Sequence, residues 1–193
     1  MPTAQIERPA PGSVALLVID MINDLQGVEH LRGPAEAAAR VIERLRADAD
    51  RLGAPVVYVN DHFGQWHSER SRLVEHVLDG AGRELARRLA PRENDFFVIK
   101  PQFSGFYSTN LPVLLPKLGA TRLVLTGVAA DICVLFTAAD AHMRDYQLWT
   151  PADAVASASD QRTAWALEIM RDSMDAEIRP TDKFSLAEWV GGG

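Results

Sequence analysis

The chain has 193 residues, 47% of them hydrophobic and 24% charged, and a formal net charge of −6. This length and composition suit one globular domain, residues 1–193, that buries its own core, and the lack of any Lys/Arg block excludes the usual surface of a nucleic-acid-binding protein. No apolar run reaches the roughly 18 residues of a membrane span, and the only cysteine, Cys133, cannot form an internal disulfide, so we expect a cytoplasmic protein without a membrane partner.

Apolar runs and helical periodicities alternate along the chain. Residues 14–20, "VALLVID", form a continuous apolar run that predicts a strand buried on both faces. Residues 33–53 predict a helix, because Pro34 stands at its start, apolar residues recur three and four apart, and Gly53 closes it. Further strands are expected at 55–60, 95–100, 121–127, 147–150 and 176–180, and further helices at 111–119, 131–145 and 160–174.

This alternation predicts an α/β domain with a mostly parallel sheet covered on both faces by helices. In open sheets of this kind, ligands bind beyond the carboxyl ends of the strands. Residues 61–77, which are polar and aromatic, follow the second strand and are expected to form a loop. This loop is a candidate wall or lid of a binding site.

Three predicted strands end in, or just before, a chemically reactive side chain: Asp20, Lys100 and Cys133. Each has an ordinary explanation on its own, as a turn former, a solvated cation or a small apolar residue. Together they can perform chemistry. The first turn of a helix and a nearby ammonium both favour a thiolate at Cys133, and a carboxylate can accept the thiol proton and later protonate a leaving amine.

Four motifs in this order resemble the isochorismatase-like cysteine hydrolases, which include nicotinamidases and N-carbamoylsarcosine amidases. The motifs are "LLVIDMINDL" (16–25), "VVYVNDHFGQW" (56–66), "VIKPQFSGFYSTNL" (98–111) and "LTGVAADICV" (125–134), and the resemblance covers about residues 12–180. It implies a Rossmann-like three-layer sandwich with a six-stranded sheet of order 3-2-1-4-5-6.

The resemblance also implies roles for individual residues. Asp20, Lys100 and Cys133 match the family's catalytic triad, and a cis peptide bond is expected between Val128 and Ala129. The amides of Ala129 and Cys133 would then form the oxyanion hole. Strand three lies two strand spacings from strand one in this order, about 10 Å away, so Lys100 must lean across strand two to reach Asp20.

The metal site of the nicotinamidases is the main departure from the family pattern. That site begins with Asp-x-His after the second strand, whereas here Asp61 is followed two places on by Phe63. His62 and His67 do not restore the spacing. We therefore predict no metal and no cofactor, with a metal at Asp61, His62 and His67 as the open alternative.

Substrate contacts are expected from the loops that flank the predicted strand ends. Asn60, Phe63, Trp66 and Phe106 could line an apolar pocket with a few polar groups, although aromatic residues on loops also serve to pack the loop against the domain. Asp131 is expected to cap the helix that carries Cys133.

These features predict an amidohydrolase that cleaves an amide, ureido or carbamoyl C–N bond of a small molecule through a thioester on Cys133. One alternative is an isochorismatase-type vinyl ether hydrolase that uses Asp20 as the acid. The other is a non-enzymatic thiol redox sensor or small-molecule binding protein. The resemblance further implies a homo-oligomer, a dimer or a tetramer.

Overall fold

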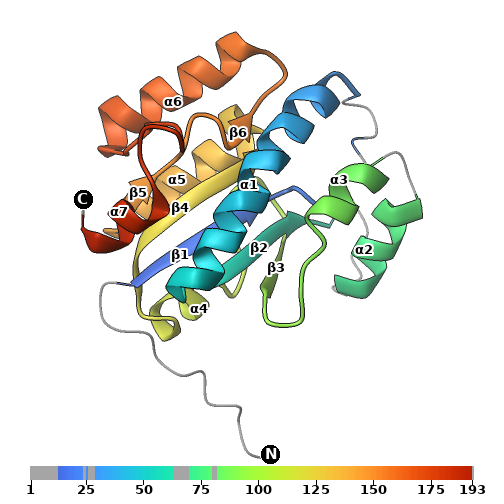
Figure 1. Ribbon diagram of the computed structural model, residues 1–193, viewed down its shortest axis with the longest axis horizontal. Coiled ribbons are helices and arrows are strands. Elements are labelled where there is room, and N and C mark those ends of the chain that lie inside the picture. Colours follow the sequence, from blue (N-terminus) through green and yellow to red (C-terminus); the bar gives the residue numbers. More distant parts are fainter. Residues whose placement is uncertain (1–12, 24, 26–28, 63–69, 80–81, 193) are drawn as a thin grey trace, which may run out of the picture.

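A parallel sheet lies between two layers of helices in the computed structural model of the chain (Figure 1). The structure describes residues 13–23, 25, 29–62, 70–79 and 82–192. The strands are β1 (Ser13–Ile19), β2 (Val56–Asp61), β3 (Phe96–Lys100), β4 (Ala120–Val128), β5 (Gln147–Trp149) and β6 (Val155–Ala156). The helices are α1 (Arg32–Leu52), α2 (Arg70–Asp79), α3 (Arg83–Arg88), α4 (Leu111–Lys117), α5 (Leu135–His142), α6 (Asp160–Met174) and α7 (Leu186–Gly191).

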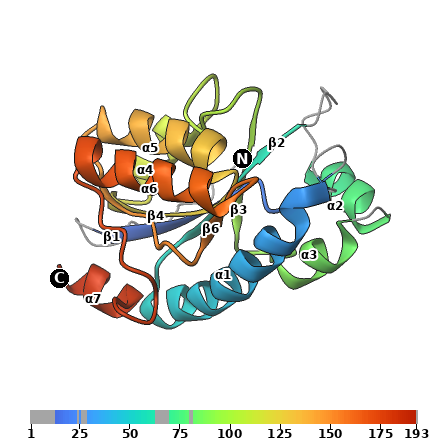
Figure 2. The same cartoon turned by 90° about the horizontal axis from the view of Figure 1, so that it is seen from above.

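The two layers follow from the alternation of side chains along the central strands. In β1, Leu16 and Val18 belong to the core cluster on the side of α1, whereas Leu17 and Ile19 belong to the cluster on the other side. Figure 2 shows the result, with α1, α3 and α7 on one face of the sheet and α4, α5 and α6 on the other. Because both faces are covered, the central strands are apolar throughout.

The sheet order is β3-β2-β1-β4-β5, and the strands in the described part of the chain pair in parallel. The predicted single α/β domain with a mostly parallel six-stranded sheet and helices on both faces is therefore confirmed. In this order β1 and β4 are neighbours at the centre of the sheet. The direction of chain progression reverses there, so their carboxyl ends mark the switch point where such folds place their ligands.

The sixth strand is not the one that the sequence predicted. β6 consists of Val155 and Ala156, and it pairs with the end of β4 rather than extending the sheet beyond β5. The predicted strand at 176–180 forms one isolated bridge, in which Glu177 pairs with Trp149. Only three residues of β5 form a ladder with β4.

The predicted loop at 61–77 is also partly wrong. β2 continues through Asp61, and Arg70–Asp79 form helix α2. Leu73 and Val77 are four residues apart and both buried, which is the spacing of one helix face. The segment that was predicted to form a loop after the second strand therefore includes a helix.

The C-terminal segment packs against its own chain. Phe184 and Leu186 are buried in the cluster on the α1 side, and the ring of Phe184 meets Trp149 edge-on at a centroid distance of 5.2 Å. Ser185 begins α7 with a capping box to Glu188. Among the residues that the structure describes, no helix has the length and apolar character to cross a membrane.

Candidate active site

Asp20, Lys100 and Cys133 come together at the carboxyl ends of three strands. Asp20 directly follows β1, Lys100 is the last residue of β3, and Cys133 lies in the π-helical turn Ala130–Val134 that follows β4. The Lys100 side chain is completely buried, and it places Nζ 2.9 Å from Oδ2 of Asp20 and 3.5 Å from Sγ of Cys133. The long lysine side chain thus spans the position of β2 and reaches the switch point.

Asp20 is held in place by its backbone and by its neighbours. Its φ of 51° lies in the left-handed region, which a non-glycine residue adopts at a cost. Its amide donates to the carbonyl of Val59, and its Oδ1 accepts a hydrogen bond from the amide of Asp61 at 2.7 Å. Burial raises the pKa of Asp20, and the nearby charge of Lys100 only partly opposes this rise.

Lys100 remains a cation despite its burial. Desolvation acts to lower the pKa of Lys100, but the charge of Asp20 and a hydrogen bond to it, together with the charge of Asp61, oppose this effect, and the pKa is raised. Nζ also lies 3.4 Å from Oδ2 of Asp61 and donates to the carbonyl of Gln102 at 3.2 Å. Asp61 is therefore a second carboxylate partner of the buried ammonium.

The pKa of the Cys133 thiol differs from what its position at the start of a helix suggested. The thiol is partly buried and shares a hydrogen bond with Asp20. Burial and the charge of Asp20 together raise the pKa of Cys133 to about 12, and Lys100 opposes them only in part. Burial therefore opposes the thiolate that the helix position of Cys133 favours, and the thiol needs a base before it can attack.

The backbone around Cys133 is shaped by the turn that follows β4. The peptide bond between Val128 and Ala129 is cis. The amides of Ile132 and Val134 both donate to the carbonyl of Ala129, so this carbonyl is the anchor of the turn. Asp131 does not cap the helix, since Ala129 is the N-cap and no side chain caps the turn.

Of the four residues predicted to contact substrate, two are buried and two lie outside the described part of the chain. Asn60 is fully buried, and its amide group exchanges hydrogen bonds with the backbone of Ile22, so it braces the segment after Asp20 from behind. Phe106 is 3% exposed and packs among Tyr146 and Arg144. Phe63 and Trp66 lie outside the described residues.

The ring contact between two aromatic residues, Phe103 and Phe136, was not predicted from the sequence. Phe103 follows Lys100 by three residues and Phe136 follows Cys133 by three, and their rings lie 5.6 Å apart. Both side chains are about half exposed. A spacing of three from each reactive residue is a signal that the sequence already contained, but it gains meaning only once the two segments are known to be neighbours.

Of the three candidate metal ligands at or after the end of β2, the structure describes Asp61 and His62. The Asp61 carboxylate faces the ammonium of Lys100. A metal ion would have to compete with this ammonium for the carboxylate. His62 is buried, and His67 lies outside the described residues. Within the part of the chain that the structure describes, no three His, Cys, Asp or Glu side chains gather as metal ligands would.

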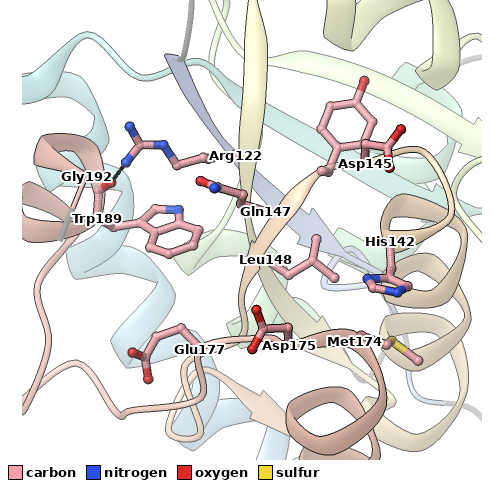
Figure 3. A pocket seen from close by; sticks show the side chains of 11 residues that line it. Arg122, His142, Asp145, Gln147, Leu148, Met174, Asp175, Glu177, Trp189 and Gly192 are labelled. Carbon is pink, nitrogen blue, oxygen red and sulfur yellow. Dashed lines mark hydrogen bonds between the residues drawn. The ribbon is translucent and has the colours of Figure 1, made fainter.

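A separate pocket of about 420 Å³ lies at the opposite edge of the sheet (Figure 3). Arg122 and Gln147, near the amino ends of β4 and β5, contribute to its wall together with Trp189 of α7. The Arg122 guanidinium donates to the carbonyl of Trp189. None of Asp20, Lys100 and Cys133 lines this pocket, so it is distinct from the candidate active site.

Comparison with known proteins agrees with the fold. The isochorismatase domain model matches residues 14–182. An uncharacterized isochorismatase family protein, YaaI of Bacillus subtilis, is 37% identical over 166 residues, which cover 85% of this chain and 92% of that protein.

Solved structures of similar fold cover most of the chain. N-carbamoylsarcosine amidase from Thermoplasma acidophilum superposes with a TM-score of 0.71 at 29% identity, over 90% of this chain and 99% of that one. The nicotinamidase SaPncA from Staphylococcus aureus superposes with a TM-score of 0.69 at 25% identity, over 87% and 98%. The chain is an α/β domain of hydrolase type, and it belongs to the isochorismatase family.

Proposed function

We propose that this protein hydrolyses a C–N bond of a small amide, ureido or carbamoyl compound, with Cys133 as the nucleophile. The observation that carries the proposal is the buried contact of Lys100 with both Asp20 and Cys133, at 2.9 and 3.5 Å. A neutral thiol that hydrogen-bonds a carboxylate is arranged for proton transfer at the moment of attack.

The proposed steps use only these groups and water. Asp20 accepts the thiol proton as Sγ attacks the substrate carbonyl, and the amides of Ala129 and Cys133 hold the resulting oxyanion. Asp20 then protonates the leaving amine, and the C–N bond breaks to leave a thioester on Cys133. Asp20 next takes a proton from water, which attacks the thioester, and the proton returns to the sulfur as the carboxylic acid is released.

The position of the thiol favours C–N hydrolysis over vinyl ether cleavage. An ether hydrolase needs an acid at Asp20 but has no task for a sulfur that hydrogen-bonds it. Two similar solved structures are an N-carbamoylsarcosine amidase and a nicotinamidase, both of which act on C–N bonds by their names. The raised pKa of Cys133 argues against a thiol sensor, because the thiolate is the form that peroxide oxidises.

The direct test is intact-mass spectrometry after brief incubation with a panel of small amides, ureido acids and carbamoyl compounds. A transient mass increase is expected in the wild-type protein and not in a Cys133→Ala variant. The added mass would identify the acyl group and hence the substrate class. Turnover of a panel compound by Cys133→Ala would overturn the proposal, because no thioester can form without the sulfur.

The pH dependence of kcat/KM gives a second prediction. Asp20 must be ionised to accept the thiol proton, so activity is lost as the pH falls through its raised pKa, above the ordinary aspartate value of 3.8. The alkaline loss requires ionisation of the thiol, whose pKa is about 12, or of Lys100, whose pKa is also raised. We therefore expect an acid-side loss of activity above pH 3.8 and no inflection at mildly alkaline pH. An inflection near the ordinary thiol pKa of about 8.5 would contradict the electrostatics described above.

A further inference from the structure

The turn that carries Cys133 is tied to the start of α6 by one side chain, Asp131. Its Oδ1 accepts a hydrogen bond from the Ser157 hydroxyl at 2.5 Å, and its own amide donates to Oγ of Ser157 at 3.1 Å. Its Oδ2 accepts from the guanidinium of Arg162 through both Nε and Nη2. The side chain of Asp131 is 13% exposed and that of Arg162 is 53% exposed, so the network runs from the buried Ser157 to the protein surface.

The short strand β6 brings these groups together. Val155 and Ala156 pair with Gly127 and Val128 at the end of β4. Ser157, which follows Ala156, therefore lies beside the residues that follow Val128. Ser157 is 1% exposed. Because β6 runs beside β4, Ser157 reaches the turn that begins two residues beyond Val128.

The start of α6 supports the same network from the other side. The Ser157 amide donates to Oγ1 of Thr163 at 3.0 Å, and the Thr163 hydroxyl donates in turn to the carbonyl of Ser159. Ser159 caps α6 by accepting from the amide of Arg162. The hydroxyl and the guanidinium that hold Asp131 are thus both fixed by the first turn of a 15-residue helix.

The partners of Asp131 favour its charged carboxylate form. Burial acts to raise the pKa of Asp131, but the hydrogen bonds from Ser157 and Arg162 outweigh it and lower the pKa. A charge-assisted pair of this kind is stronger than a hydrogen bond between neutral groups. The side chain of Asp131 bonds Ser157 and Arg162 rather than Lys100 or Asp20, so its effect on the reaction must pass through the turn.

We infer that Asp131 is a positioning residue, and that Ser157 and Arg162 clamp it so that the π-turn holds Cys133 against Asp20 and Lys100. The inference rests on the proposed function for its catalytic consequence. A displacement of about 1 Å at a reacting group can cost on the order of a hundredfold in rate. The turn is short, and the clamp binds it two residues before the sulfur.

Two variants remove the clamp with little change in volume. Asp131→Asn removes the charge that holds Arg162, and Ser157→Ala removes the hydroxyl. For each we expect kcat to fall by about ten- to a hundredfold with KM changed less than about threefold. The matched control is Glu168→Gln, which removes a carboxylate from the exposed face of α6, 3.9 Å from Arg171, and should leave kcat unchanged.

Alkylation of Cys133 provides a readout that does not depend on any substrate. The rate with iodoacetamide is measured against pH for the wild type and each variant. Without the clamp, we expect the thiol to move away from its buried contact with Asp20, a contact that raises the pKa of the thiol. The pH at which the alkylation rate is half-maximal, the alkylation midpoint, should therefore shift to a lower value. A double-mutant cycle of Asp131→Asn with Arg162→Gln should give non-additive shifts, since both remove the same contact.

The outcomes separate the clamp from the proposed function. If the wild type hydrolyses no panel compound but the alkylation midpoint still shifts in the variants, the clamp stands and the proposed function fails. If kcat per folded enzyme and the midpoint both match the wild type, the clamp is overturned. A lowered melting temperature with an unshifted midpoint would also overturn it, because Asp131 would then serve stability alone.

Discussion

Replacing Cys133 with alanine is expected to lower kcat by about 10⁴-fold or more, the scale seen when an enzyme loses its nucleophile. Replacing Asp20 with asparagine should lower kcat by about 10²- to 10⁴-fold, because the amide still accepts the hydrogen bond from Asp61 but cannot accept a proton. The measurement is steady-state turnover of any compound that gives a mass adduct, normalised to the folded fraction.

The pair of variants distinguishes two chemistries. For C–N hydrolysis through a thioester, both variants are nearly inactive. For vinyl ether cleavage, Asp20→Asn alone is inactive and Cys133→Ala keeps most of its activity. Asp172→Asn is a suitable control, because Asp172 is an exposed carboxylate on α6 paired with Arg171, and its loss should change neither rate.

Replacing Gly127 with alanine should destabilise the fold by about 3 kcal/mol or more, from strain and overpacking together. Gly127 has a φ of 112°, and a Cβ atom there would lie 2.0 Å from the carbonyl oxygen of Ile19. That oxygen belongs to the backbone of the neighbouring strand β1 and cannot move without shifting Asp20. Urea unfolding of the purified variant measures the effect.

Gly33 offers the matched control. It lies in the first turn of α1, and a Cβ there would have no atom within 4 Å. Gly33→Ala should be neutral or stabilise the protein by roughly 0.5–1 kcal/mol, since alanine costs less conformational entropy in a helix. If Gly127→Ala unfolded at the same urea concentration as Gly33→Ala, the close approach of β1 and β4 would not be a constraint on the fold.

The sequence predicted what depends on local periodicity. The apolar run before Asp20 and the spacing in α1 and α6 each extend over several residues, so the resulting elements were located to within a residue or two. The residues at the strand ends then followed from the parallel arrangement, because all parallel strands end at the same edge. The contact between Lys100 and Asp20 needed the structure, since it depends on one side chain crossing β2.

The remaining features depend on tertiary contacts that leave no local pattern. β6 has two residues and is defined only by its partner β4. Ser157 meets Asp131 across 26 positions of sequence, and nothing around either residue indicates the other. The pKa of Cys133 was mispredicted for the same reason, because helix position is visible in the sequence and burial beside Asp20 is not.

The buried ammonium of Lys100 has a consequence for the cost of the chemical step. In the proposed mechanism the proton moves from Cys133 to Asp20, two groups that both contact the buried ammonium of Lys100. The total charge of the three side chains is therefore the same before and after the transfer, and only the location of one negative charge changes. Such a shift between two sites of one counter-ion demands little reorientation of the surrounding dipoles, which is the main source of barriers for charge movement in water.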